Sequence, residues 1–136
     1  MASGRQPKLL IGNSFPLSLI VRRIVVEPRP IEELRVKMEG AIVVSFWGHP
    51  STLASASAAV GRDLSPSSGR PALLLDANGL PSLEGESFEE CWVVSPEFAP
   101  GFRPAPGVEV MPEKILGWRV LRLAWLEALQ IATPDP

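Results

Sequence analysis

The sequence predicts a single-domain α/β sandwich with a mixed β-sheet and flanking helices. Apolar runs of strand length alternate with segments whose apolar residues have helical spacing. The 136 residues suit one domain, and 46% hydrophobic residues exclude wholesale disorder. The 15 prolines and 11 glycines predict short elements and many turns. We therefore expect residues 1–136 to form one domain, with frayed tails at 1–7 and 130–136.

Short apolar runs predict the strands. The expected strands are 8–11, 22–26, 41–46, 71–76, 91–94 and 118–125. The continuous, β-branched run 41–46 predicts a strand buried on both faces. Pro28 and Pro30 are expected to end the second strand, and the five prolines from Pro96 to Pro112 predict a loop or edge element.

Two segments have the pattern of a helix. Ile31, Leu34 and Met38 repeat at helical spacing within 31–39, and a glycine follows at position 40. The segment 53–60 is rich in Ala and Ser, so its helix can pack closely on a sheet. Glycine is the residue expected just past a helix end. A single helical turn is expected over 17–20, and Asn78-Gly79 predicts a turn.

Charge and composition exclude several classes of function. The formal net charge of −2 argues against a duplex-DNA binder, which normally carries a basic surplus. One cysteine, Cys91, excludes an internal disulfide, and one histidine, His49, excludes a multi-histidine metal site. We expect no metal and no cofactor. No apolar run is long enough for a membrane span, and the start lacks a signal peptide, so we expect a cytoplasmic protein.

The segment after the run 41–46 is the strongest candidate for a functional site. Gly48 lets the backbone approach a ligand, and Ser51 or Thr52 can cap the helix that follows. A helix N-terminus after a strand favours an anion. His49 would lie at the rim, where a phosphate favours its protonated, acidic form. The alternative is a solvated or capping histidine beside an ordinary turn.

Small polar residues also follow the first expected strand. Asn13 and Ser14 can hold a sugar hydroxyl or a phosphate there, or form an ordinary turn. Two such strand ends, side by side at one edge of a sheet, would build a shared site.

The basic residues are mostly arginine, with 10 Arg and 3 Lys. Arginine binds phosphate bidentately, which makes Arg70 and Arg103 candidates, although either can equally be a surface charge. Arg22 and Arg23 are expected to face water. The four tryptophans are expected in the core or at an interface. Four glutamates share one short segment and are expected on a solvated face: Glu84, Glu86, Glu89 and Glu90.

Two motifs together resemble a known family. The segment 12–20 is similar to an Asn-Ala-Phe-Ser-hydrophobic stretch, and 47–52 is similar to an Ile-Gly-His-x-Ser-Thr motif leading into a helix. The family is the viral and cellular ring nucleases, known as anti-CRISPR proteins. They cleave cyclic tetra-adenylate, the second messenger of type III CRISPR defence. The resemblance covers residues 9–62 best and implies a dimeric α/β sandwich that needs no metal.

The resemblance also implies roles for single residues. His49 matches the family's general acid, and Asn13 matches an Asn near the scissile phosphate. Arg70 stands where a family arginine follows the helix, and Arg103 is the candidate for a second arginine. Pro16 replaces a family serine that helps to orient the ribose, and proline cannot play that role; this departure affects catalysis more than binding.

The expected partners are therefore cyclic tetra-adenylate, or a related cyclic oligoadenylate, and a second copy of the chain. The strand 118–125 or the C-terminal tail is the expected dimer interface. Two alternatives stay open. One is a non-catalytic binder, a sponge or sensor for the same messenger; the other is a small protein-interaction module without a nucleotide ligand.

Overall fold

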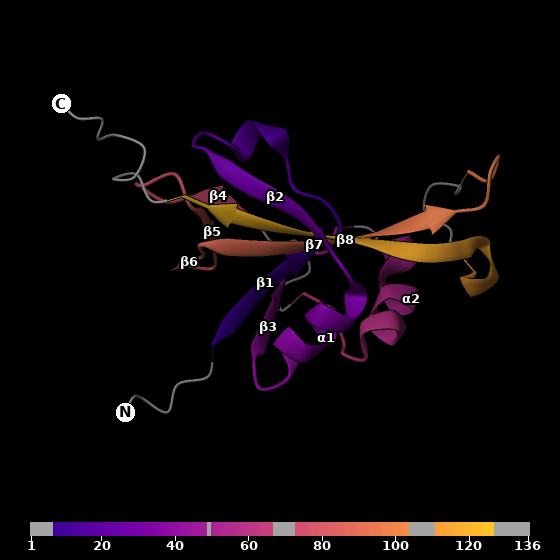
Figure 1. The fold of residues 1–136 in the computed structure, drawn as a ribbon. Helices are drawn as coiled ribbons and strands as arrows, with labels where there is room; N and C mark the ends of the chain where they lie inside the picture. The colour runs from indigo at the N-terminus through magenta and orange to yellow at the C-terminus, as the bar shows by residue number, and fades with distance from the viewer. Residues whose placement is uncertain (1–6, 49, 67–72, 104–110, 127–136) are drawn as a thin grey trace.

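The computed structural model describes residues 7–48, 50–66, 73–103 and 111–126. Within these ranges the chain forms a five-stranded mixed sheet in the order β2-β8-β7-β1-β3, a three-stranded antiparallel sheet β4-β5-β6, and two α-helices (Figure 1). This architecture confirms the expected α/β class with a mixed sheet.

The elements are as follows. The large sheet contains β1 (Lys8–Gly12), β2 (Ile24–Arg29), β3 (Ile42–Ser45), β7 (Glu90–Phe98) and β8 (Ile115–Trp125). The small sheet contains β4 (Leu74–Leu75), β5 (Pro81–Leu83) and β6 (Glu86–Ser87). The helices are α1 (Ile31–Met38) and α2 (Pro50–Val60), with 3-10 turns η1 (Leu17–Leu19) and η2 (Pro112–Lys114).

Strand direction decides where the loops gather. β1 is parallel to both β3 and β7, whereas β8 is antiparallel to β7 and β2. The carboxyl ends of β1, β3 and β7 therefore meet at one edge of the sheet.

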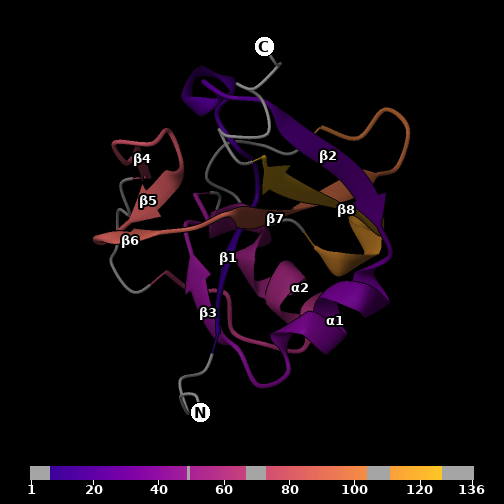
Figure 2. The same cartoon turned by 60° about the vertical axis from the view of Figure 1, so that its left-hand side comes forward.

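The large sheet is covered differently on its two faces (Figure 2). α1 and α2 pack on one face, where Leu34, Met38, Ala56 and Val60 join a cluster with Trp92. The small sheet packs on the other face; the cluster there includes Leu10, Leu83, Phe88, Cys91 and Trp125.

Burial raises the pKa of the Cys91 thiol, with Glu90 nearby adding to the effect. The prediction of core tryptophans is confirmed for Trp47, Trp92 and Trp125.

The prediction that the strand 41–46 is buried on both faces is confirmed in part. Ala41 and Val43 pack in the cluster beneath the helices, and Val44 and Phe46 pack in the cluster on the opposite face. β3 lies at the edge of the large sheet and pairs only with β1. Its first residue, Ile42, is 43% exposed. A continuous apolar run does not distinguish a central strand from an edge strand whose ends are partly covered.

β2 begins and ends two to three residues later than expected, and it runs through Pro28. The Leu126 N–H donates to the Arg23 carbonyl at 3.3 Å, which identifies Arg23 and Leu126 as a hydrogen-bonded pair. Such pairs alternate along an antiparallel ladder, so Pro28, opposite Leu121, directs its nitrogen away from β8. The N–H that proline lacks falls on the outer edge of the sheet, so no ladder bond is lost.

The small sheet was only partly predicted. Of the expected strand 71–76, β4 comprises Leu74 and Leu75, and residues 71 and 72 lie outside the described ranges. The hairpin of β5 and β6 was missed because its strands are so short. Glu84 (φ 51°) and Gly85 (φ 84°) make its two-residue turn. The turn at Asn78-Gly79 is confirmed, with Gly79 at φ 79°.

Side chains fix this sheet to the rest of the molecule. The Asp76 carboxylate accepts hydrogen bonds from the Ser87 hydroxyl and from the N–H groups of Leu80 and Asn78, which lower the pKa of Asp76. Arg22 does not merely face water: it donates to the Asn78 carbonyl at 2.9 Å and to the Leu126 carbonyl.

Two of the four clustered glutamates are ion-paired rather than simply solvated. Glu86 pairs with Lys8. Glu90 pairs with Arg122 and lies 3.6 Å from the Lys37 ammonium of α1.

The last two strands form a longer hairpin than expected. β7 continues through Pro96 to Phe98, and β8 begins at Ile115. β1 pairs with β7 only as far as Gly12 opposite Val93, so the Pro96 nitrogen faces no strand on that side. In the part of the chain that is described, no helix is long and apolar enough to cross a membrane.

Candidate functional site

The two polar strand ends meet, as the sequence predicts. The Phe46 N–H donates to the Ile11 carbonyl at 2.9 Å, which extends the pairing of β1 and β3 past the end of β3. Beyond it, the Gly48 N–H donates to Oδ1 of Asn13 at 2.9 Å. The residues after β1 and those after β3 thus form one joined surface at the carboxyl edge of the sheet.

This hydrogen bond sets the orientation of the Asn13 amide. Because Oδ1 accepts the Gly48 N–H, the amide nitrogen Nδ2 faces the other way and presents its two donors. Asn13 is half-buried, whereas Ser14 and Gly48 are exposed. The surface therefore offers hydrogen-bond donors to a ligand, and such donors suit a phosphate or a ribose oxygen.

The third parallel strand, β7, contributes a residue that sequence reasoning missed. The Ser95 hydroxyl donates to the Asn13 main-chain carbonyl at 3.2 Å. Ser95 follows the buried run of β7 much as Asn13 follows β1. The signal in the sequence that could have identified Ser95 is a small polar residue directly after a buried apolar run.

Close packing beneath the site fixes the path of the chain. A Cβ on Gly12 would lie 2.4 Å from the Phe46 ring, so only glycine allows this ring to cover the end of β1. Phe15 packs edge-on against Phe46, with ring centroids 6.4 Å apart, and against Trp125 at 5.2 Å. Asn13 and Ser14 are thus held between the buried Gly12 and the partly buried Phe15.

α2 starts directly after this surface. It begins at Pro50, three residues before the expected start, and Ser51 and Thr52 lie in its first turn. Thr52 is buried and has an interaction partner, so it is part of the packed structure. The N-terminal end of a helix carries partial positive charge, which favours an anion. His49 lies outside the described residues.

Of the two predicted arginines, Arg103 is the one within the described residues. Arg103 is exposed beyond the end of β7. Its neighbour Phe102 packs on Phe98 at 5.4 Å, and the Lys114 ammonium lies 5.7 Å from the Phe102 ring. Arg70 lies outside the described residues.

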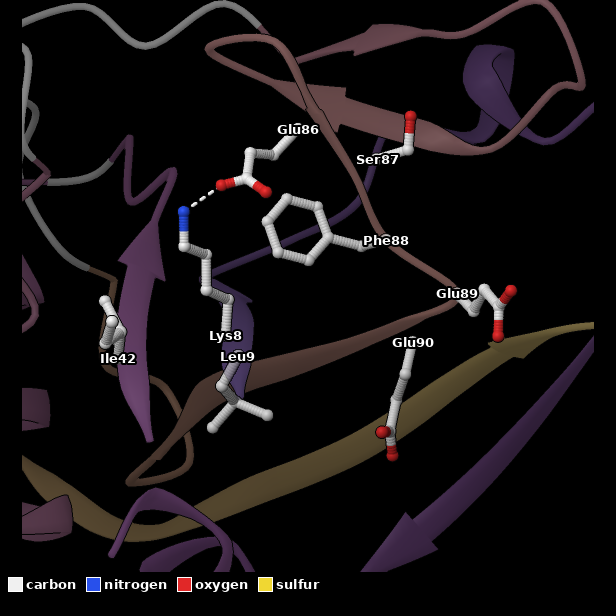
Figure 3. Close-up of a pocket in the computed structure, with 8 residues that line it drawn as sticks. All are labelled: Lys8, Leu9, Ile42, Glu86, Ser87, Phe88, Glu89 and Glu90. Carbon is white, nitrogen blue, oxygen red and sulfur yellow. Dashed lines mark hydrogen bonds and ion pairs between the residues drawn. The ribbon is translucent and has the colours of Figure 1, made fainter. Parts of the chain in front are cut away.

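A separate hollow of about 660 Å³ lies at the opposite, amino end of β1 (Figure 3). The Lys8 and Glu86 side chains form an ion pair within it. Its lining consists of Lys8, Leu9, Ile42, Glu86, Ser87, Phe88, Glu89 and Glu90. Three carboxylates and one lysine do not suit an anionic ligand, and none of the predicted site residues lines it. Across the described ranges, no group of three or more His, Cys, Asp or Glu side chains is placed to hold a metal.

The fold is a mixed α/β sandwich, and this surface places polar residues at the carboxyl ends of β1 and β3, beside Ser95 of β7. No family model matches the chain, and no curated protein matches it. Among solved structures, the chain is similar to B116 of Sulfolobus turreted icosahedral virus. The TM-score is 0.49 at 17% sequence identity, and the match covers 88% of this chain and 99% of that one.

Proposed function

We propose that the protein binds cyclic tetra-adenylate and cleaves it without a metal, which would switch off type III CRISPR signalling. The hydrogen bond between the Gly48 N–H and Oδ1 of Asn13 carries this proposal. It joins the two segments on which the resemblance to ring nucleases depends, although they are 35 residues apart in the sequence.

The chemistry uses a nucleophile of the substrate itself. A ribose 2′-OH gives its proton to water and attacks the adjacent phosphorus in line, and the bond from phosphorus to the 5′-oxygen breaks. The 5′-oxygen takes a proton from His49 acting as general acid. The products are linear fragments that end in a 2′,3′-cyclic phosphate. The Asn13 amide donors and an arginine, Arg103 or Arg70, stabilise the charge that develops on the phosphate.

A specific observation favours a second candidate, a non-catalytic sponge or sensor for the same messenger. Pro16 stands in place of the family's serine and has no side-chain hydroxyl to orient the ribose. Its backbone, at φ −66° and ψ 126°, leads into η1. Ser14 and Ser18 are both exposed and are the nearby hydroxyls that can take over this role.

Incubation of the purified protein with labelled cyclic tetra-adenylate in EDTA tests the proposal. Linear fragments with cyclic phosphate ends are expected, and they would support a metal-independent nuclease. A stable complex without products would favour the sponge or sensor. Absence of both binding and cleavage would overturn the ligand assignment.

A further inference from the structure

The ends of β7 and β8 form a two-stranded arm that extends past the rest of the large sheet (Figure 1). β1 stops pairing with β7 at Val93, and β2 stops pairing with β8 at Val120. Within the described residues, no further strand flanks positions 95–98 and 115–119. The base of this arm borders the candidate site, because Ser95 belongs to both.

The hydrogen-bond register of the arm places Arg119 beside Ser95. The Trp125 N–H donates to the Glu89 carbonyl at 3.0 Å, and hydrogen-bonded pairs recur at every second residue of an antiparallel ladder. Ser95 and Arg119 are therefore such a pair, with Cα atoms about 5.5 Å apart and both side chains on one face of the sheet. On this face the Ser95 hydroxyl donates to the Asn13 carbonyl at 3.2 Å. Arg119 is thus separated from Asn13 by Ser95.

The Arg119 side chain has hydrogen-bond donors that the fold does not use. Its Nη2 lies 3.7 Å from Oε2 of Glu97, which is too far for a hydrogen bond, and the side chain is 65% exposed. Other arginines donate hydrogen bonds to carbonyl or carboxylate oxygens of the protein, namely Arg22, Arg29, Arg35, Arg62 and Arg122. Their guanidinium groups are committed to the fold, whereas that of Arg119 can bind an anion.

The contact between Glu97 and Arg119 is one that a phosphate can replace. Glu97 lies opposite Gly117, where a Cβ would be 3.1 Å from its Oε1, so the missing side chain leaves room for the carboxylate. Both charged groups are at least half exposed, and the attraction between exposed charges is weak in water. A phosphate accepts two parallel hydrogen bonds from a planar guanidinium, which is a stronger interaction than this contact.

We propose that Arg119 binds a phosphate of the cyclic oligoadenylate other than the one that is cleaved. This assignment rests on the proposed function, in which the Asn13 amide donors bind the phosphate that is cleaved. Asn13 follows β1 and Arg119 lies on β8, so in the strand order β7 separates the two groups. Neighbouring phosphates of one ring can reach both. Arg119 therefore favours a ligand with several phosphates, and neither motif of the resemblance contains this residue.

Affinity and single-turnover cleavage of labelled cyclic tetra-adenylate, measured on the full chain in EDTA, test this role. Arg119→Gln is expected to bind roughly 10- to 100-fold more weakly, the usual effect of losing a hydrogen bond to a charged group. Arg119→Lys keeps the charge without the planar fork, so its affinity should lie between those of the wild type and Arg119→Gln. With the protein in saturating excess, Arg119→Gln should cleave at the wild-type rate, because the cleaved phosphate keeps its own contacts.

Arg23→Gln is the matched control. It removes the same charge from an exposed arginine, but Arg23 lies beside Leu126, at the far end of β8 from Arg119. We expect its affinity to stay near that of the wild type. The affinity of Arg119→Gln should also depend less on salt than that of the wild type or the control, because one ion pair with the ligand is lost.

The outcomes separate this assignment from the proposed function. If the wild type neither binds nor cleaves the ring, both fail. If the wild type binds and Arg119→Gln binds no more weakly than Arg23→Gln, only the assignment to Arg119 fails. An unchanged affinity with slower cleavage at saturation also overturns the assignment, since Arg119 would then act on the cleaved phosphate. If the wild type binds without cleaving, as a sponge or sensor would, the affinities alone decide.

Discussion

Gly48 donates its backbone N–H to Oδ1 of Asn13 at 2.9 Å, and this bond connects the chain after β3 with the chain after β1. The main-chain carbonyl of the same asparagine accepts the Ser95 hydroxyl. Asn13 therefore links the chain after β1 and β3 with Ser95 of the third parallel strand, β7. It has a structural role toward Gly48 and, in the proposed function, a binding role through Nδ2.

The two roles of Asn13 can be separated by substitution. Asn13→Ala loses both, so we expect the free energy of unfolding to fall by about 1 kcal/mol, the usual net value of one hydrogen bond, and ligand binding to weaken. Asn13→Asp keeps an oxygen for the Gly48 N–H but lacks the amide donors and adds a negative charge. We expect its stability to stay near that of the wild type and its binding of cyclic tetra-adenylate to be lost.

Urea unfolding and calorimetric titration measure the two quantities. Equal affinity of the wild type and Asn13→Asp would contradict the binding role of Nδ2. Equal stability of the wild type and Asn13→Ala would contradict the structural role of Oδ1.

The close contact between Gly12 and Phe46 predicts a large cost for a single methyl group. In Gly12→Ala the new Cβ would lie 2.4 Å from the ring, so the ring must move. We expect a loss of about 1–3 kcal/mol in the free energy of unfolding, as for overpacked cores. Adding Phe46→Leu should recover part of this loss in a double-mutant cycle. Gly48→Ala is the control for adding a methyl group, because the nearest atom to its new Cβ would be 3.9 Å away. Additive effects of Gly12→Ala and Phe46→Leu would show that the contact between the two residues does not cause the loss of stability.

His49→Ala tests the proposed general acid. Removal of such a group typically lowers the rate by ~10²–10⁴-fold, and binding should change little because the ligand contacts of Asn13 remain. Single-turnover cleavage and affinity, measured on the same preparation, give both numbers. Unchanged turnover would exclude His49 as the acid.

Stability should fall in acid partly through the small sheet. Hydrogen bonds lower the pKa of Asp76 in the folded state. The contribution of the Asp76 carboxylate to the free energy of unfolding is therefore present above its unfolded-state pKa, and it is lost as the pH falls through its folded-state pKa. The pKa of Asp63 is lowered in the same direction by Ser65. Asp76→Asn should therefore flatten the decline in stability below about pH 4. Thermal unfolding from pH 2 to 7 measures this, and parallel curves for variant and wild type would disprove it.

The elements found from the sequence are those with strong local signals. β1, α1 and the body of α2 agree with expectation, and Gly40 and Gly61 follow the helices with φ of 74° and 76°. The errors arise from information that no single segment carries. Whether Pro28 ends a strand depends on which side of it is unpaired, and the exposure of Ile42 depends on the place of β3 at the sheet edge.

The candidate site was predictable where strand ends carry polar residues. Asn13 and Gly48 were predicted separately, and their contact follows from the parallel pairing of β1 and β3. Ser95 was missed because the strand containing it was expected to end at position 94. The expected dimer interface, on the strand 118–125 or the C-terminal tail, stays a prediction. The edges of β8 are occupied by β7 and, over Val120–Trp125, by β2, so in this range β8 could contribute to an interface through its side chains and not by strand pairing.

The burial of Cys91 has a practical consequence for measuring distances. It is the single cysteine of the chain, it is fully buried, and its raised pKa keeps the thiol protonated and unreactive. A cysteine introduced at an exposed position, such as Glu32 on α1, would therefore accept a spin label or dye selectively without removal of the native thiol. Pulsed electron resonance on such a sample would show whether two labels come within measurable distance of each other, and a diamagnetic diluent would show whether that distance is intermolecular.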